Sequence, residues 1–413
     1  MDQFLTNYYR LMSALSLAMD FSSHGLMKHH MRVTLISLQL GRLFGLSQGQ
    51  MDKLFSAAML HDAGSSTWVE KDQIMPFQSK QTFEHCHRGY LLFKEHPLFH
   101  SIAEVILFHH DRWDAVGNAS GLKERSIPIE SRIIHLADRV EVMLKEDVYI
   151  LQQSKFICQI INQQSGRMFD PRLVEAFNDL SHRECFWLDL KSEFITEILA
   201  HHCPVAHKEL GLPEVTAIAE TMASVIDFKS PFTHRHSRGV ANVSFLLAQL
   251  VKLPDNECSA IKIAGLLHDL GKLSIPDTIL NKNGPLTPIE FDIIKRHTYY
   301  TFHILKMVNG FEKINHYASC HHESLNGTGY PFKLDSSDLK LGAKIIAVAD
   351  IFTALTEDRP YRPALEKEAV EQILRKRVKT GAIDPELTHL LLAHYSEAEQ
   401  AGKDLSDKLF KNH

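Results

Sequence analysis

Histidines and aspartates recur along this chain in an order that suits metal binding. The chain has 26 histidines, and histidine is the commonest metal ligand in proteins. Two sets of seven residues each contain an adjacent His-Asp pair, an adjacent His-His pair and a later aspartate. The first set is His29, His61, Asp62, His85, His109, His110 and Asp138. The second set is His236, His268, Asp269, His297, His321, His322 and Asp350.

The spacing within the two sets is nearly the same. The first histidine precedes the His-Asp pair by 32 residues in both sets (61 − 29 and 268 − 236). The single histidine precedes the His-His pair by 24 residues (109 − 85 and 321 − 297), and the pair precedes the last aspartate by 28 (138 − 110 and 350 − 322). Only the step from the His-Asp pair to the single histidine differs, at 24 and 29 residues, which predicts a five-residue loop insertion (29 − 24) in the second copy. Three repeated intervals indicate a duplicated domain.

Each set offers five imidazoles and two carboxylates, which are ligands for transition metals. Seven ligands are too many for one ion but suit two, and the two oxygens of Asp269 could bridge them. Two ions about 3.5–4 Å apart hold a bridging hydroxide and neutralise a phosphoryl oxygen, which is the apparatus for phosphodiester hydrolysis. The alternative, a group of hydrogen-bonded core histidines, does not explain the repeated intervals.

The segments that must position these residues have helical patterns. Apolar residues recur every three or four positions over 33–46 and 241–253. Residues 259–268 predict a buried helix that ends at Gly271, and 339–355 predict another that carries Asp350. Alternating strand patterns are almost absent, so the sequence predicts an all-α fold with ligands projecting inward from several helices.

Composition narrows the class of protein. The formal net charge of −5 gives no general electrostatic case for a nucleic acid polymer as partner. The six cysteines form no C-x-x-C pair, and the first residues lack a signal-peptide pattern. No apolar run approaches the roughly 18 residues that span a bilayer. We therefore expect a reduced, cytoplasmic, soluble protein with no membrane partner.

Longer motifs in the second copy resemble the HD-GYP family of metal-dependent phosphohydrolases, within the HD superfamily. They are HDLGK at 268–272, HHESLNGTGYP at 321–331 and VADIFTALTEDRPYRP at 348–363. The resemblance is strong over about 216–380 and fainter in the first copy. It implies hydrolysis of bacterial cyclic dinucleotides at a di- or tri-nuclear iron or manganese centre. By the same motifs, the seven residues of the second set are the metal ligands, and Asp269 bridges the ions and takes part in catalysis.

The resemblance also suggests residues that contact the substrate. Lys272 matches a family lysine that meets the scissile phosphate or the metal-bound hydroxide, where it offers positive charge and a proton to the leaving oxygen. Arg359 and Arg362 match basic positions that contact the dinucleotide, and an arginine fork suits phosphate and guanine edges. The signature loop consists of Gly329, Tyr330 and Pro331. In the family this loop also binds partners, including cyclases that make the substrate.

Two departures from the family pattern lie in the second copy. Asn326 stands where the family usually has aspartate. Phe232 stands where three-metal members have a glutamate, and a phenyl ring cannot ligate a metal. We therefore expect two divalent ions, with iron favoured over manganese.

The first copy keeps its seven ligands but lacks the other motifs. Ser65 aligns with Lys272 (61 + 4 and 268 + 4), and no GYP follows its His-His pair. Asp147 (138 + 9) and Ile150 (138 + 12) align with the two arginines of the second copy. The sequence therefore predicts a catalytically disabled duplicate with a regulatory, dimerising or substrate-presenting role. Whether it binds metal, and whether the chain forms a homodimer, stay open at this point.

We therefore expect tandem HD-type helical bundles joined by a partly helical linker. The predicted boundaries are 1–180 for the degenerate HD domain, 181–215 for the linker and 216–413 for the catalytic HD-GYP domain. The expected function is a phosphodiesterase that opens a cyclic dinucleotide to linear pNpN. Cyclic di-GMP and 3′,3′-cyclic GMP-AMP are both candidates, and the tandem arrangement favours the second.

Two other functions are compatible with parts of the sequence. A non-catalytic cyclic dinucleotide receptor or interaction module fits the first copy, but the intact ligands and Lys272 argue against it in the second. A nucleotidase of the broader HD superfamily would explain the metal ligands but not the GYP or DRPYR motifs.

Overall fold

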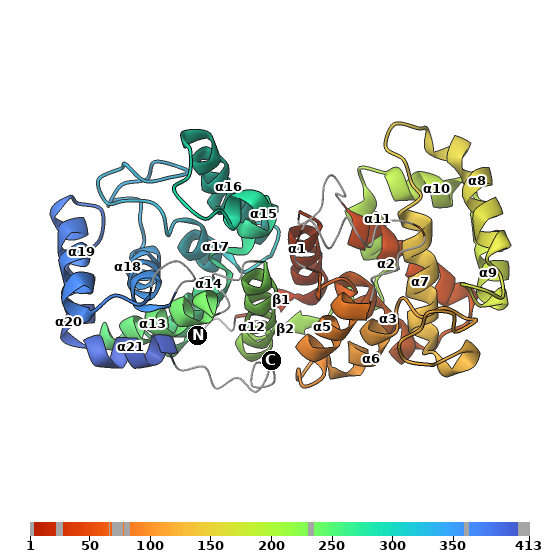
Figure 1. Cartoon of the computed structure of the whole chain (residues 1–413), viewed down its shortest axis with the longest axis horizontal. Coiled ribbons are helices and arrows are strands. Elements are labelled where there is room, and N and C mark those ends of the chain that lie inside the picture. Colours follow the sequence, from red (N-terminus) through yellow and green to blue (C-terminus); the bar gives the residue numbers. More distant parts are fainter. Residues whose placement is uncertain are drawn as a thin grey trace. The chain divides into compact units, whose positions relative to one another are not determined.

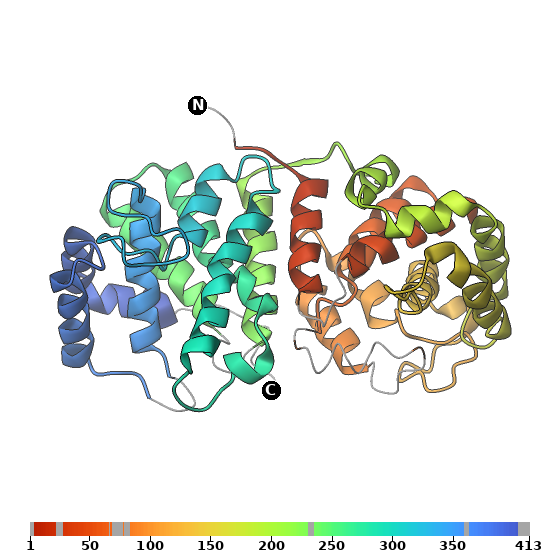
Figure 2. The same cartoon turned by 90° about the horizontal axis from the view of Figure 1, so that it is seen from above.

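A computed structural model of the chain describes residues 4–21, 28–65, 67, 77, 83–229, 235–358 and 363–403. The chain divides into two compact units. One unit is Asn7–Lys208, and the other is Glu209–His413 together with Met1–Thr6. We call them the first and second bundle and describe each by itself (Figures 1 and 2).

The first bundle consists of helices. They are α1 (Tyr8–Asp20), α2 (His29–Leu43), α3 (Gln48–Leu60), α5 (Phe83–Phe93), η1 (His100–Ile102), α6 (Ala103–Leu107), η2 (Glu124–Ser126), α7 (Ile129–Glu141), α8 (Ile150–Gln163), α9 (Pro171–Ser181), α10 (Glu184–Lys191) and α11 (Ile195–His202).

The second bundle repeats this plan. Its helices are α12 (Leu212–Phe228), α13 (His236–Leu250), α14 (Asp255–Leu267), η3 (Leu270–Ser274), α15 (Asp277–Leu280), α16 (Pro288–Leu305), α17 (Glu312–Ser319), α18 (Leu341–Thr356), α19 (Lys367–Lys379), α20 (Pro385–Ala393) and α21 (Tyr395–Lys403). The two short strands β1 (Thr6–Asn7) and β2 (Glu209–Leu210) pair with each other. The prediction of an all-α fold is therefore confirmed.

Five helices correspond between the bundles, and they carry the repeated residues. In the first bundle α2 packs against α3 and α7, and α5 packs against α6. In the second bundle α13 packs against α14 and α18, and α16 against α17 (Figure 1). Helices α2 and α13 begin at the first histidine of each set, His29 and His236. The last aspartates, Asp138 and Asp350, lie on α7 and α18.

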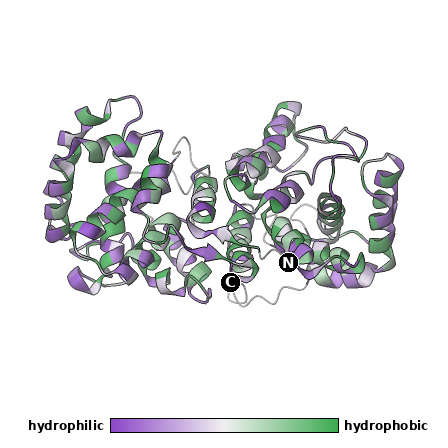
Figure 3. Ribbon diagram, turned by 180° about the vertical axis from the view of Figure 1, so that it is seen from behind, coloured by the Kyte–Doolittle hydropathy of each residue, from purple (hydrophilic) through white to green (hydrophobic). Residues whose placement is uncertain are grey.

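The cores follow the apolar patterns of the sequence. Figure 3 shows polar and apolar residues on different faces of many helices. Helix α18 is apolar almost throughout and is buried from Ala343 to Asp350 apart from the half-buried Lys344. In the described ranges, no helix combines the length and apolarity that crossing a bilayer requires.

Two boundaries differ from the sequence-based expectation. The predicted linker at 181–215 is largely part of the first bundle, since α10 and α11 bury Phe186, Trp187 and Leu199 and pack against α8, α9 and α2. The division falls between Lys208 and Glu209. The helix expected to end at Gly271 ends instead at Leu267, and Gly271 lies in the 3₁₀ helix η3.

The five additional residues of the second copy lie between its His-Asp pair and His297, an interval that contains η3, α15 and the first half of α16. The corresponding stretch of the first bundle lies mostly outside the described residues.

Candidate metal centre

The second bundle brings all seven predicted ligands together. The ligands form three overlapping groups, and within each group the donor atoms lie within 4.8 Å of one another. These groups are His236, His268 and Asp350; His268, Asp269 and His321; and His297, His321 and His322. The donors come from the start of α13, the end of α14, the middle of α16, the turn after α17 and the middle of α18.

Backbone carbonyls orient three of the imidazoles. The Nδ1 atoms of His268, His297 and His321 each donate to a carbonyl three residues earlier, at 2.7 Å. Metal-ligating histidines commonly donate the other ring N–H in this way, which leaves Nε2 for the ion. The buried atoms His268 Nε2 and Asp269 Oδ1 have no hydrogen-bond partner among the described residues. Two buried polar atoms without a hydrogen-bond partner fit a metal centre.

The protonation states also suit metal ions. Burial lowers the pKa of His297 to about 3 and that of His322 to about 4, so both imidazoles are neutral. Burial opposes ionisation of Asp269, but His268 and Lys272 outweigh it and hold the carboxyl pKa well below its usual range. Neutral imidazoles and ionised carboxylates are the forms that bind cations.

His236 lies between two carboxylates. Its Nε2 is 3.0 Å from Asp350 Oδ1, and its Nδ1 is 3.2 Å from Glu357 Oε1. Burial disfavours the imidazolium, yet Glu357 and Asp350 raise the pKa of His236 to about 10. A metal ion held at Nε2 of His236 would displace the proton from that nitrogen.

Glu357 is a site residue that sequence reasoning missed. It supports His236 from the outside, as outer-shell carboxylates support metal-bound histidines. In the first bundle Glu141 takes this role, with Oε2 2.6 Å from His29 Nδ1. Glu357 follows its aspartate by seven residues and Glu141 by three (357 − 350 and 141 − 138), so aligning the two copies does not pair them.

Lys272 reaches the ligands from η3. Its Nζ lies 2.5 Å from Asp269 Oδ2, and its side chain is 20% exposed. The turn that carries it is held against α16, because Gly271 N donates to Thr301 Oγ1 at 2.9 Å. A Cβ at Gly271 would lie 1.9 Å from the carbonyl oxygen of His297, so only glycine allows this approach.

The GYP loop folds back over the His-His pair. Tyr330 N donates to the carbonyl of His322, and the centroids of the two rings are 4.9 Å apart. Gly329 passes so near Glu323 that a Cβ would lie 2.4 Å from its Cα. The loop therefore borders the centre, and Pro331 follows the tyrosine at its turn. Asn326 joins it to the end of α19 through a bond from Nδ2 to the Thr380 carbonyl, at 2.8 Å.

Three residues named from the sequence lie outside the described residues. Arg359, Arg362 and Phe232 fall in stretches without a described position. Their expected roles in substrate contact and in metal count therefore stay predictions.

The first bundle assembles its seven residues in the same way. His85 Nε2 and His109 Nε2 are 3.4 Å apart, as are His297 Nε2 and His321 Nε2 in the second bundle. His61 and His109 also donate Nδ1 to carbonyls three residues earlier. Asp62 Oδ1 lies 3.5 Å from His85 Nε2. The seven ligands therefore converge in both bundles, with differences in distance: His29 Nε2 lies 3.7 Å from Asp138 Oδ1, and His236 Nε2 lies 3.0 Å from Asp350 Oδ1.

The side chains around those ligands do distinguish them. The buried Ser65 takes the place of the lysine. Arg139 Nη2 contacts Asp138 Oδ2 at 2.5 Å, where the second bundle has Ile351. Cys86 lies beside the histidines, where the second bundle has Thr298.

Comparison with known proteins identifies relatives over most of the chain. A family model described as HD domain matches residues 15–173 and 220–387. The chain is 32% identical to a 3′3′-cGAMP-specific phosphodiesterase of Vibrio cholerae, over 90% of this chain and 88% of that protein. It is 38% identical to a cyclic di-GMP phosphodiesterase of Pseudomonas aeruginosa, over 60% of this chain and 54% of the relative.

A solved structure supports the same fold. The chain superposes on the crystal structure of a cyclic GMP-AMP-specific phosphodiesterase of Vibrio cholerae with a TM-score of 0.67 and 27% identity. The match covers 95% of this chain and 98% of the other.

Proposed function

The chain belongs to the HD domain family, and we propose that its second bundle hydrolyses cyclic dinucleotides at a metal centre. The chain is a metal-dependent cyclic dinucleotide phosphodiesterase, as its similarity to such enzymes over both bundles supports. One observation carries the assignment to the second bundle: Lys272 contacts Asp269 among seven converged ligands. The first bundle has Ser65 at the corresponding place.

We propose that the second bundle holds two divalent ions, iron or manganese. His236, His268, Asp269 and Asp350 would hold one ion, and Asp269, His297, His321 and His322 the other. The two oxygens of Asp269 have different neighbours, since Oδ2 is 3.2 Å from His268 Nε2 and Oδ1 is 3.5 Å from His297 Nε2. Asp269 therefore suits a bridging position. Such a pair of ions supplies an activated water and neutralises charge on a phosphoryl oxygen.

Lys272 provides a cation and a proton next to that centre. Its ammonium lies against Asp269 and remains partly exposed, so it can face a phosphodiester that enters from the solvent side. As the ester bond breaks, negative charge develops on the leaving ribose oxygen, and a positioned ammonium stabilises it and donates a proton. The products would be a linear dinucleotide with one new phosphate end.

The GYP loop supplies an aromatic surface beside the ligands. Tyr330 lies next to His322 and remains partly exposed, so its ring can stack on a nucleobase. Gly329 and Pro331 fix the turn that presents it. Arg359 and Arg362 would complete this side of the substrate site by binding phosphate or guanine edges.

We propose 3′,3′-cyclic GMP-AMP as the preferred substrate. Two cGAMP-specific relatives match about nine-tenths of this chain, whereas the cyclic di-GMP phosphodiesterase of Pseudomonas aeruginosa matches 60%. The test is incubation of the reduced, metal-loaded chain with each dinucleotide, followed by chromatography of the products. Faster linearisation of cyclic GMP-AMP supports the proposal, and faster linearisation of cyclic di-GMP contradicts it. Tight binding without product would favour the receptor alternative.

We further propose that the GYP loop is a docking surface for a cyclase that makes the substrate. Large apolar side chains are exposed on α16 and the loop: Ile289 (75%), Phe291 (43%), Tyr299 (47%) and Phe332 (36%). Replacing Ile289 by Ser should weaken binding of such a cyclase while turnover stays unchanged. Unaltered binding would contradict the proposal. We also propose that the chain forms a homodimer, and sedimentation of the chain alone tests this proposal.

A further inference from the structure

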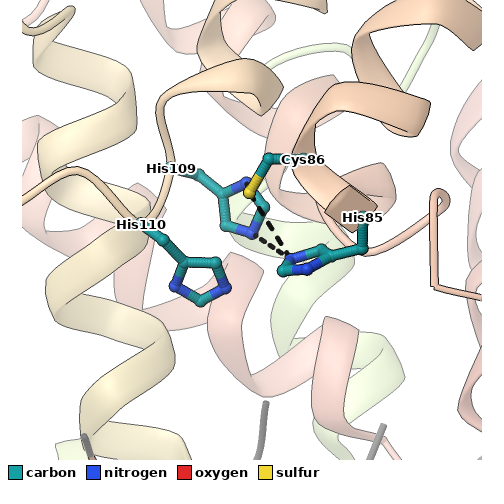
Figure 4. Close-up of side chains that lie close together, drawn as sticks. All are labelled: His85, Cys86, His109 and His110. Atoms are coloured by element: carbon teal, nitrogen blue, oxygen red, sulfur yellow. Dashed lines mark hydrogen bonds between the residues drawn. The ribbon is translucent and has the colours of Figure 1, made fainter. Parts of the chain in front are cut away.

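We propose that the first bundle holds one structural transition-metal ion through His85, Cys86, His109 and His110. The four donor atoms lie within 4.8 Å of one another. Figure 4 shows Cys86 and His85, at the start of α5, facing the two histidines that follow α6. This site differs from the centre of the second bundle because one donor is a sulfur atom.

Two of the donor–donor distances fit a tetrahedral ion. With zinc–nitrogen bonds of about 2.0–2.1 Å and a zinc–sulfur bond of about 2.3 Å, the donors at two tetrahedral corners are about 3.3 Å apart for two nitrogens and about 3.6 Å for nitrogen and sulfur. His85 Nε2 lies 3.4 Å from His109 Nε2 and 3.6 Å from Cys86 Sγ. Both edges that meet at His85 therefore have the required length.

The histidines present the nitrogens that an ion needs. His109 donates Nδ1 to the Ile106 carbonyl at 2.6 Å, which leaves Nε2 to face His85. The His110 side chain is only 6% exposed, and its Nε2 has no hydrogen-bond partner among the described residues. A buried ring nitrogen without a partner calls for a ligand.

Two replacements explain why this bundle would hold one ion and not two. The other half of the centre needs Asp138, but Arg139 pairs with that carboxylate through Nε at 3.1 Å and Nη2 at 2.5 Å. A guanidinium at this distance neutralises the carboxylate and repels a second cation. Cys86, where the second copy has Thr298, adds a donor to the half that remains.

The donor set indicates the class of ion and its role. Thiolate and imidazole together favour zinc, whereas carboxylate-rich sites favour harder ions. A site closed by four protein donors leaves no position for water and is typical of structural zinc. The ion would join the start of α5 to the turn after α6. A cavity of about 420 Å³ borders the site at Cys86, His110 and Arg139.

Cobalt(II) tests the proposal, because a thiolate ligand gives it a charge-transfer absorption band in the near ultraviolet. The full chain is used with His268→Ala and Asp269→Ala, so that the second bundle contributes no intact centre. We expect one tightly held cobalt per chain and a thiolate band. Retention of no cobalt, or of cobalt without the band, would overturn the proposal.

Matched variants assign the sulfur. In the same background, Cys86→Thr introduces the residue type of the second copy and should abolish the band. It should also weaken cobalt binding by more than about 10-fold, since loss of an outer-shell partner alone costs about 10–100-fold. Cys158→Ser, a half-buried cysteine of the same bundle, should keep both. A band that persists in Cys86→Thr with unchanged helical circular dichroism refutes the site. If Cys86→Thr does not fold, His110→Gln provides the test. This variant should weaken cobalt binding and keep the band, and an unchanged affinity for cobalt would refute the role of His110.

Discussion

The two bundles hold the histidines of their His-Asp pairs in the same backbone conformation but surround the pairs with different side chains. His61 and His268 follow α3 and α14 with φ of −56° and −57° and with ψ of −35° in both. The lysine that follows His268 by four residues is a serine in the first bundle. A duplicated scaffold therefore preserved the positions of the ligands, while a few neighbouring side chains decide which chemistry each bundle can perform.

Double substitutions of the two His-Asp pairs should give the largest difference in turnover between the bundles. His268→Ala with Asp269→Ala removes two ligands, one of them the proposed bridge, and should reduce linear product below detection. His61→Ala with Asp62→Ala should leave turnover largely intact, because we propose that hydrolysis takes place in the second bundle. Product chromatography at equal protein concentration measures both. If the second variant is the inactive one, the assignment of roles is reversed.

Lys272 should account for the next largest difference. Lys272→Met keeps the ligands and removes the ammonium beside Asp269, so kcat should fall by about 10²–10³-fold, as when one positioned donor is lost. Its matched partner is Ser65→Lys, which should create no activity in a chain with His268→Ala and Asp269→Ala. Full activity of Lys272→Met would show that the lysine is only a surface cation.

Glu357 should act through metal affinity. Glu357→Gln removes the charge next to His236 Nδ1, so the affinity for the activating metal should drop by about 10–100-fold. Activity measured against metal concentration should recover at high metal. A loss that added metal does not restore would instead place Glu357 in substrate binding.

The smallest effects concern the turns that follow the His-Asp pairs. A Cβ would lie 1.9 Å from the His297 carbonyl oxygen at Gly271 and 2.0 Å from that of His85 at Gly64. Each Gly→Ala change should destabilise its own bundle by about 1–3 kcal/mol, since backbone atoms must move. Thermal unfolding should register both changes, but only Gly271→Ala should slow turnover. Equal losses of activity in the two variants would instead show that turnover depends on both bundles.

The sequence allowed the convergence of the seven residues of each set, and most of the helices that carry them, to be predicted, because intervals of 32, 24 and 28 residues repeat. It could not supply the contacts that modify those ligands. Arg139 and Cys86 align with residues of another type in the second copy, and Glu357 does not align with Glu141. Aligning the two copies therefore does not identify any of the three. Their roles depend on which side chains packing brings into contact with the ligands. Likewise, the linker predicted at 181–215 is largely part of the first bundle, because packing buries Trp187 there.

The most direct test is anomalous diffraction at the iron or manganese edge, together with elemental analysis, on crystals of protein shown to be active. Our account predicts peaks among His297, His321 and His322 and between His236 and Asp350 in the second bundle. Active protein without metal at these positions would contradict it.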